Sequence, residues 1–184
     1  MPSNPAPGQL ETIRNFVNTY DAEDDSDRVA TPDALQQWFV ERDLLEPGHT
    51  LTTAEHKRAM AVRTALHQTL MSHHGEPLPP EAPEVLEDAS CRARFGLRFS
   101  AKGCSHLEPK ADGVDGAIGR LLAIAHEADV EGTWQRLKVC PAEDCLVAFY
   151  DKSRNHSAVW CDMAVCGNRA KVREYRERRL KTGA

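Results

Sequence analysis

Four cysteines near the C-terminal end of the chain occur as two pairs with the same internal spacing. Cys140 and Cys145 are separated by four residues, as are Cys161 and Cys166, and fifteen residues lie between the pairs. Two thiol pairs in short loops, joined by enough chain for a hairpin, are typical of a tetrahedral zinc site with four cysteine ligands. Four protein ligands leave no open position for a substrate, so we expect one structural Zn²⁺ that maintains the fold.

The alternative for paired cysteines is a set of disulfides, which requires an oxidising compartment. The sequence begins MPSNPAPGQLETIRNF, which has neither the basic region nor the apolar region of a signal peptide. Apolar runs in the sequence are also far shorter than the roughly 18 residues of a membrane span. We therefore expect a cytoplasmic protein without a membrane partner, in which the paired cysteines bind metal.

Charge divides the chain into two parts of opposite sign. Residues 140–184 contain nine Lys and Arg against six Asp and Glu, whereas the rest of the chain contains 14 against 22. A chain of 184 residues has room for one ordinary domain and a small module. We predict a body over residues 1–136 and a zinc module over 137–184, and only the basic module is suited to approach a polyanion.

Helical periodicity accounts for most of the body. Apolar residues at helical spacing predict helices over residues 10–20, 31–39, 52–73 and 114–128. The second begins with Pro32 in its first turn, and the third begins with a capping box formed by Thr52 and Glu55. The body is therefore expected to be mainly helical.

A short β-hairpin is predicted between the third and fourth of these helices. Residues 75–83 contain four prolines in nine positions and are not expected to be helical. Residues 92–99 then alternate apolar and polar side chains, as a half-buried strand does, and a partner strand would run through His106. Cys91 and Cys104 flank this hairpin, and we expect buried apolar thiols there rather than a redox pair. The fold class is thus α+β, with a mainly helical body, a short β-hairpin and a zinc appendage.

The zinc module has the element order of a treble-clef zinc finger. Residues 140–145 would form the first metal-binding knuckle, and residues 146–150 and 158–160 would pair as the two strands of a hairpin. A helix from Met163 onward would place Cys166 in its first turn, where a thiolate gains from the helix dipole.

Two segments carry a resemblance to known families. The segment WCDMAVCGNRAK at residues 160–171 resembles the signature of the CGNR zinc finger family. The segment FVNT at residues 16–19 is similar to the start of the ABATE domain that accompanies this finger. The resemblance implies a stress-induced bacterial transcription regulator whose finger binds DNA. In one departure, this chain has HSAV at residues 156–159, where many such fingers have several arginines, which leaves fewer phosphate contacts.

The C-terminal helix is the predicted nucleic-acid interface. Arg169, Arg173 and Arg176 are spaced four and three residues apart and therefore share a helix face. With Lys171, they are expected to contact DNA phosphates. The alternative is a zinc-stabilised protein-interaction module, in which Val172, Tyr175 and the hairpin face bind a partner or a second copy of the chain.

Four further residues are expected to support the metal site. Gly167 would relieve crowding beside Cys166, and Trp160 would cover the metal from solvent. Asn168 or Asp151 would connect the C-terminal helix to the hairpin.

The sequence argues against an enzyme. It contains no glycine-rich phosphate loop and no nucleophile motif. His73 and His74 are adjacent, so they would diverge on a helix, which is poor geometry for sharing a metal. No residue pattern identifies a small-molecule effector, a DNA target sequence or an oligomeric state.

Overall fold

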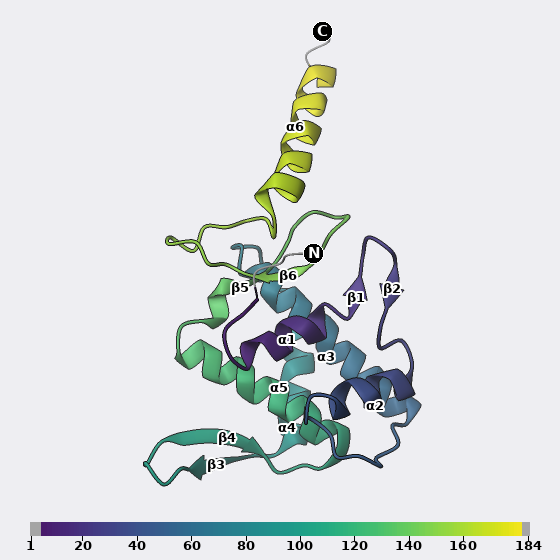
Figure 1. The fold of residues 1–184 in the computed structure, drawn as a ribbon, viewed down its shortest axis with the longest axis vertical. Helices are drawn as coiled ribbons and strands as arrows, with labels where there is room; N and C mark the ends of the chain where they lie inside the picture. The colour runs from purple at the N-terminus through teal and green to yellow at the C-terminus, as the bar shows by residue number, and fades with distance from the viewer. Residues whose placement is uncertain (1–4, 182–184) are drawn as a thin grey trace.

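The computed structural model describes residues 5–181 and shows a helical body from which the C-terminal helix projects (Figure 1). The helices of the body are α1 (Leu10–Val17), α2 (Pro32–Val40), α3 (Thr53–Ser72), α4 (Glu81–Ala93) and α5 (Gly113–Val130). A 3-10 turn, η1 (Trp134–Arg136), and a π turn, η2 (Met163–Gly167), precede the last helix, α6 (Asn168–Lys181).

In the described part of the chain, six short strands form three separate antiparallel pairs. They are β1 (Tyr20–Asp21) with β2 (Ser26–Asp27), β3 (Phe95–Phe99) with β4 (Ser105–Pro109), and β5 (Leu137–Val139) with β6 (Ala148–Tyr150). The predicted fold class, a mainly helical α+β body with a short hairpin and a C-terminal four-cysteine finger, is confirmed. Within residues 5–181, none of the helices combines the length and the apolar character needed to cross a bilayer.

The helices predicted from periodicity form the core of the body. Thr31 caps α2 and Thr52 forms the predicted capping box with Glu55 at the start of α3, so both helices begin where the sequence indicates. Apolar side chains from α1, α2, α3 and α5 meet in one buried cluster, which includes the fully buried Phe16, Phe39, Leu66 and Leu121.

Helix α4 is not predicted from the sequence, and it begins inside the proline-containing segment 75–83, which is expected not to be helical. Pro83 is the third residue of α4, where the backbone amides have no intrahelical acceptor, so proline's missing N–H costs nothing there. The predicted strand at residues 92–99 is wrong in its first three residues. Ala93 ends α4, and Arg94 turns the chain with a left-handed φ of 52° before β3 begins at Phe95.

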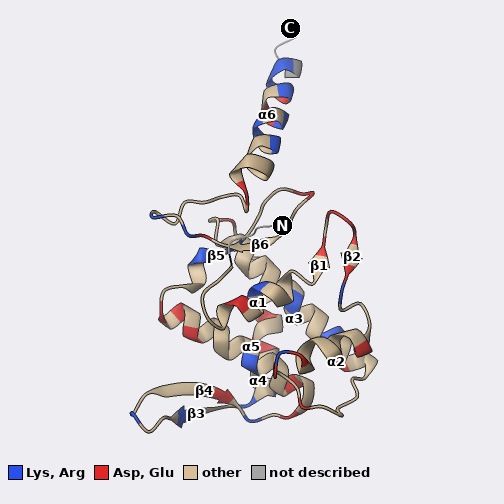
Figure 2. Cartoon of the chain, viewed as in Figure 1, with Lys and Arg blue, Asp and Glu red and all other residues tan. Residues whose placement is uncertain are grey.

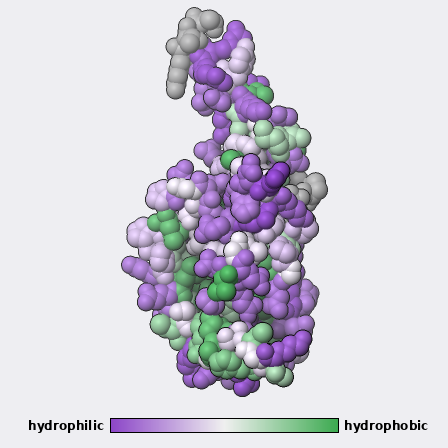
Figure 3. All heavy atoms as spheres, turned by 90° about the vertical axis from the view of Figure 1, so that its left-hand side faces the viewer, coloured by the Kyte–Doolittle hydropathy of each residue, from purple (hydrophilic) through white to green (hydrophobic). Residues whose placement is uncertain are grey.

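The β3–β4 hairpin extends from the end of the body opposite α6 (Figure 1). Leu97 pairs with Leu107 across it, yet Leu97 is 58% exposed and Phe99 is 69% exposed. The expectation of a half-buried strand is therefore wrong over its outer half. Figure 3 shows hydrophobic surface at this end of the molecule, whereas the projecting end is mainly hydrophilic. Cys91 and Cys104 are also exposed, which corrects the expectation that both thiols are buried.

Strand β6 pairs with β5 and not with residues 158–160, which form no strand in the described chain. The predicted hairpin of residues 146–150 with 158–160 is therefore wrong. Leu137, Val139 and Ala148 are fully buried and belong to the same core as the body helices. The hydrophobic core of the body thus continues beyond residue 136 into β5 and β6.

The β5–β6 hairpin has two different faces, because side chains alternate along a strand. Leu137, Val139, Ala148 and Tyr150 face the body core, whereas Phe149 packs with the cysteine cluster on the other side. Asn18, just after α1, fixes the hairpin to the body through its side chain. Its Nδ2 donates to the Ala148 carbonyl at 2.9 Å, and its Oδ1 accepts from the Ala148 backbone amide at 2.7 Å. The hairpin is therefore a shared wall between the body and the finger.

Candidate metal centre

The four predicted ligand cysteines lie together at the base of α6. Their sulfur atoms are all within 4.8 Å of one another. The Cys145 and Cys161 sulfurs are 3.5 Å apart, and the Cys161 and Cys166 sulfurs are 3.7 Å apart. A tetrahedral zinc ion with bonds of about 2.3 Å places its sulfur ligands about 3.8 Å apart. The arrangement therefore fits one zinc ion with four thiolate ligands.

The first cysteine pair lies in a tight turn that continues from the β5–β6 hairpin. The Cys140 amide donates to the Val147 carbonyl at 2.9 Å, which extends the strand pairing by one step. The Cys145 and Leu146 amides both donate to the Ala142 carbonyl, and Leu146 takes a left-handed φ of 51°. This geometry turns both sulfur atoms to the same side of the hairpin.

The second pair lies at the start of the C-terminal helical segment. The Asp162 carboxylate caps η2 by accepting hydrogen bonds from the Ala164 and Val165 amides, and the following turn buries Cys166. A Cβ at Gly167 would lie 2.5 Å from the Met163 sulfur and 3.2 Å from Trp160 Cδ1. The crowding at Gly167 therefore comes from Met163 and Trp160, and Trp160 packs against the small cluster that contains Cys140 and Cys166.

The thiols of this cluster need a cation before they can all ionise. Hydrogen bonds from Cys145 and Cys161 lower the pKa of Cys140 to about 2. The hydrogen bond to Cys140 in turn raises the pKa of Cys145 to about 12, and the pKa of Cys161 is raised for the same reason. One thiolate is thus stabilised at the expense of its neighbours. A dication supplies the missing charge, and four soft sulfur donors favour zinc among the common divalent ions.

Comparison with known families identifies both parts of the chain. Residues 12–130 match the ABATE family, described as "Putative stress-induced transcription regulator". The chain belongs to this family. Residues 136–179 match the CGNR zinc finger. The four clustered cysteines therefore form the single structural zinc site of a CGNR finger. No curated protein matches the chain.

In this CGNR finger, the arginine of the motif lies against the metal site. Arg169 Nη2 donates to the Cys166 sulfur at 3.4 Å, and Nη1 donates to Asp144 Oδ2 at 2.9 Å. Asp144 lies in the first knuckle, so Arg169 connects the two halves of the cysteine cluster. Such hydrogen bonds to a ligand orient it and stabilise its charge. Arg169, which is predicted to contact phosphates, thus also has a place at the metal centre.

The other predicted phosphate contacts differ in their surroundings. Arg173 is 3.7 Å from Glu143 of the first knuckle, in a pair that is largely exposed. Lys171 and Arg176 are exposed on α6. Lys171 and Arg176 are thus exposed, and Arg173 is in a weak surface pair.

Replacing Arg169 tests its place in the metal centre. Arg169→Gln is expected to speed transfer of zinc to a chromophoric chelator by about tenfold, the lower end of what outer-shell partners contribute to metal affinity. Arg176→Gln, on the same helix but away from the sulfurs, is the matched control and should release zinc at the wild-type rate. If the two variants release zinc at the same rate, Arg169 does not stabilise the bound zinc.

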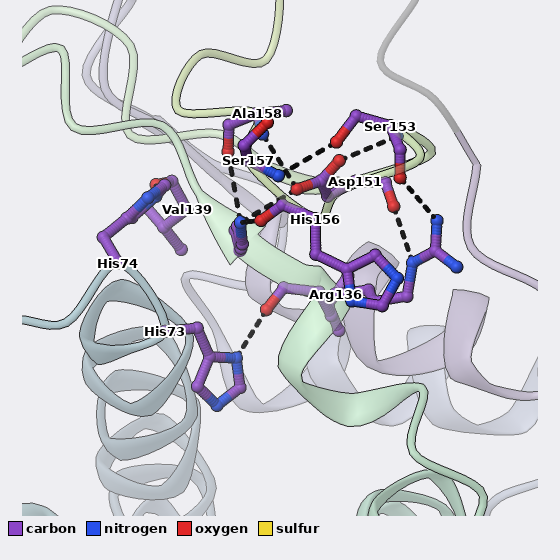
Figure 4. Close-up of polar contacts among 11 residues, drawn as sticks. His73, His74, Arg136, Val139, Asp151, Ser153, His156, Ser157 and Ala158 are labelled. Carbon is purple, nitrogen blue, oxygen red and sulfur yellow. Dashed lines mark hydrogen bonds and ion pairs between the residues drawn. The ribbon is translucent and has the colours of Figure 1, made fainter.

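A buried ion pair between Lys138 and Asp151 connects the loop of residues 153–158, here called the finger loop, to the β5–β6 hairpin (Figure 4). Asp151 is fully buried and accepts from Lys138 Nζ at 2.9 Å, from the Ser153 amide at 2.9 Å and from the Ala158 amide at 3.0 Å. Lys138 also donates to the His156 carbonyl at 2.7 Å and the Ala158 carbonyl at 3.3 Å. Burial raises the pKa of Asp151, but the hydrogen bonds from Lys138 and Ser153 outweigh it and lower the pKa to about 2.

These contacts correct the expectation that Asn168 or Asp151 bridges α6 to the hairpin. Asp151 connects the hairpin to the 153–158 loop instead. Asn168 donates to the Ala164 carbonyl one turn earlier, at 2.9 Å. Sequence reasoning missed Lys138 altogether, because a single lysine between two apolar residues gives no sign of an aspartate partner thirteen positions later.

Three histidines of the α3 segment connect the finger to the body. His73 and His74 bond the Leu137 and Val139 carbonyls, both at 2.7 Å, and His67 bonds the Leu146 carbonyl at 3.2 Å. Burial lowers the pKa of His67 and of His73 below the ordinary value. His73 directly follows α3 and His74 comes next, and both side chains reach carbonyls of strand β5. The zinc module is therefore fixed to α3 by side-chain contacts as well as by the shared core.

Proposed function

We propose that this chain is a zinc-dependent transcription regulator that binds DNA through α6. The observation that supports this most is the charge and exposure of the helix. Residues 169–179 contain six Lys and Arg against two Glu, and all residues from Lys171 to Arg179 are exposed. Figure 2 shows these basic residues spaced along the projecting helix, away from the acidic residues of the body. A cationic rod held apart from an acidic body is suited to a polyanion.

The zinc site supports this function by fixing the base of the helix. Cys166 lies in the turn that leads into α6, so the metal joins the start of the helix to the hairpin and thereby to the body. Chemistry at the metal has no part in the proposal, since four protein ligands leave no position for a substrate. The ABATE body would then carry the signal or the assembly function of the regulator.

Removing the exposed cations is expected to weaken DNA binding in a salt-dependent way. For Lys171→Gln with Arg176→Gln, the slope of log K against log salt should become less steep by about 1.8, because each lost phosphate contact accounts for about 0.9. Fluorescence anisotropy with a labelled mixed-sequence duplex at several salt concentrations measures this slope. Arg92→Gln is the control, since Arg92 is exposed on α4 of the body and pairs with Asp88. A wild-type chain that binds no nucleic acid, or binds it without salt dependence, would refute the proposal.

One observation favours a different second function, binding of a protein partner through the β3–β4 hairpin of the body. Leu97 and Phe99 expose apolar side chains on the same face of the β3–β4 hairpin. A two-stranded hairpin of this kind is marginally stable alone, and packing of a partner against its apolar face would stabilise it. In this case a protein partner should stay bound at high salt, be lost with Leu97→Ser and Phe99→Ser, and be unaffected by changes in α6.

A further inference from the structure

The exposed face of α6 has an apolar centre. A groove of about 640 Å³ runs along one side of η2 and α6, and its lining includes Val165, Val172, Arg173 and Arg176. Val165 is 46% exposed and Val172 is 47% exposed. Both line this groove, Val165 from the π turn η2 and Val172 from α6. Aliphatic side chains left in solvent on such a polar helix point to a contact surface that is more than a set of charges.

Cations border this apolar line on both sides. At 100° per residue, Lys171 lies on one side of Val172 and Arg173 on the other, while Arg176 lies beside the valines, one turn further along. This face of the helix thus has an apolar centre with Arg176 next to it, and it has Lys171 on one edge and Arg173 on the other.

The position of α6 in the molecule leaves this face accessible. The helix projects beyond the rest of the chain (Figure 1), and its main packing partner is η2, at its own base. At about 1.5 Å per residue, fourteen residues make a rod of about 21 Å. A large, elongated partner can therefore reach the rod without meeting the body.

We propose that α6 enters the major groove of B-form DNA, with Val165, Val172 and Arg176 toward the base edges and Lys171 and Arg173 toward the phosphates of the two groove walls. The inference deepens the proposed function and rests on it. A helix with side chains is about 10–12 Å across, and the major groove is about 12 Å wide. Aliphatic side chains contact the thymine methyl group there, and arginine pairs with guanine O6 and N7.

Single-stranded nucleic acid fits this surface poorly. Proteins that bind single strands stack the bases on exposed aromatic side chains. The only aromatic residue of α6 is Tyr175, while Trp160 packs on the cysteine cluster and Phe149 is 1% exposed.

Duplex RNA and a second copy of the chain also fit poorly. The deep, narrow major groove of duplex RNA does not admit a helix. A second copy packing along α6 would need an apolar seam repeated over several heptads, and this helix face has only two valines. Duplex DNA is the occupant that the dimensions, the charge and the apolar line favour together.

The first experiment compares nucleic acids on the full zinc-loaded chain. Fluorescence anisotropy would use a mixed-sequence DNA duplex of about 20 base pairs, each of its single strands, and the RNA duplex of the same sequence. We expect the DNA duplex to bind at least about tenfold tighter than the other three, a difference of about 1.4 kcal/mol. Equal or tighter binding of a single strand or of the RNA duplex overturns the inference but not nucleic-acid binding. Absence of binding to all four overturns the proposed function itself.

The second experiment tests the apolar line without changing charge. Duplexes selected from a random pool by the wild-type chain would be measured with Val172→Ser, which should bind about tenfold more weakly. Ala170→Ser, nearly opposite on the helix, is the control and should bind as the wild type does. Replacing thymine by uracil in the selected duplex should weaken the wild type but not Val172→Ser. If Val172→Ser binds the selected duplex like the wild type, the valine face does not read DNA and the inference fails.

Discussion

Cys166→Ser is expected to abolish stoichiometric zinc binding and to lower the melting temperature of the whole chain by about 10 °C. The finger has little apolar material of its own: Cys140, Ala142, Phe149 and Cys166 are its buried cluster, with Trp160 packed against it. A module of this size depends on its metal, and structural zinc contributes on the order of 10 kcal/mol in isolated fingers. Most of that free energy offsets the ordering of the finger loops themselves.

The effect should reach the body because the β5–β6 hairpin is shared. Leu137, Val139 and Ala148 are buried in the body core, and the hairpin leads directly into Cys140 on one strand. Without zinc, the ends of both strands lose their anchor, and the contacts from His73 and His74 loosen with them. A loss of about 3 kcal/mol from this region would shift the melting temperature of a chain of this size by about 10 °C.

The chain supplies its own controls for this experiment. Cys91 and Cys104 are exposed and lie outside the metal cluster, so Cys91→Ser and Cys104→Ser should keep zinc and the wild-type melting temperature. Zinc content per chain and thermal unfolding followed by circular dichroism measure both quantities in reduced protein. If Cys166→Ser unfolds the finger at low temperature but leaves the main transition unchanged, the finger and body unfold independently. The β5–β6 hairpin then does not couple the stability of the finger to that of the body.

Local signals in the sequence were sufficient for the long helices and for the cysteine cluster. The capping box at Thr52 and Glu55 sets the start of α3, and apolar spacing alone locates α5. The cysteines were recognised because metal coordination imposes a spacing that survives in the sequence. In each case the determining residues lie within a few positions of one another, or the chemistry restricts them to one arrangement.

The errors occurred where distant parts of the chain decide the structure. Strand β5 has three residues, with Lys138 between Leu137 and Val139, so it gives a weak strand signal. It becomes a buried strand because Asp151 neutralises that lysine and the body helices cover its other face. Residues 158–160 have the stronger local strand composition, but the backbone of Ala158 bonds Asp151 and Lys138 instead of a strand partner.

The contacts of Arg169 at the metal centre could not be predicted for a related reason. Its spacing from Arg173 and Arg176 correctly predicts a common helix face. Spacing does not show that the first knuckle places Asp144 next to that face, or that the Cys166 sulfur lies within reach of the guanidinium. Charge counted along a helix therefore does not show which cations already have partners within the chain.

Lys138→Ala is expected to destabilise the chain by about 3–5 kcal/mol, because it leaves a buried carboxylate without its counter-charge. The side chains of Lys138 and Asp151 are 6% and 0% exposed, and all the hydrogen bonds described for the ammonium group go to Asp151 and two loop carbonyls. Chemical denaturation at neutral pH, with the slope of the unfolding free energy against denaturant checked for constancy, measures the loss.

The pH dependence of this loss provides a second measurement. The pKa of Asp151 is lowered to about 2 in the folded chain, against about 3.9 for an ordinary aspartate. The pair therefore stabilises the fold fully above about pH 4 and loses this contribution as the pH falls toward 2. In Lys138→Ala the carboxylate loses the partner that lowers its pKa, so the stability gap between variant and wild type should narrow as the pH falls through that window.

An exposed ion pair in the same chain separates the effect of burial from that of charge. Arg98 and Glu108 are 2.6 Å apart on the β3–β4 hairpin, with side chains 66% and 46% exposed. Because water screens this pair, Arg98→Ala should cost less than about 1 kcal/mol although its separation is shorter than that of Lys138 and Asp151. If the two alanine variants lose similar stability, the Lys138–Asp151 pair is solvated in solution and does not hold the finger loop to the hairpin. A large loss only at Lys138 would show that the finger loop is attached to the shared wall through a desolvated charge pair.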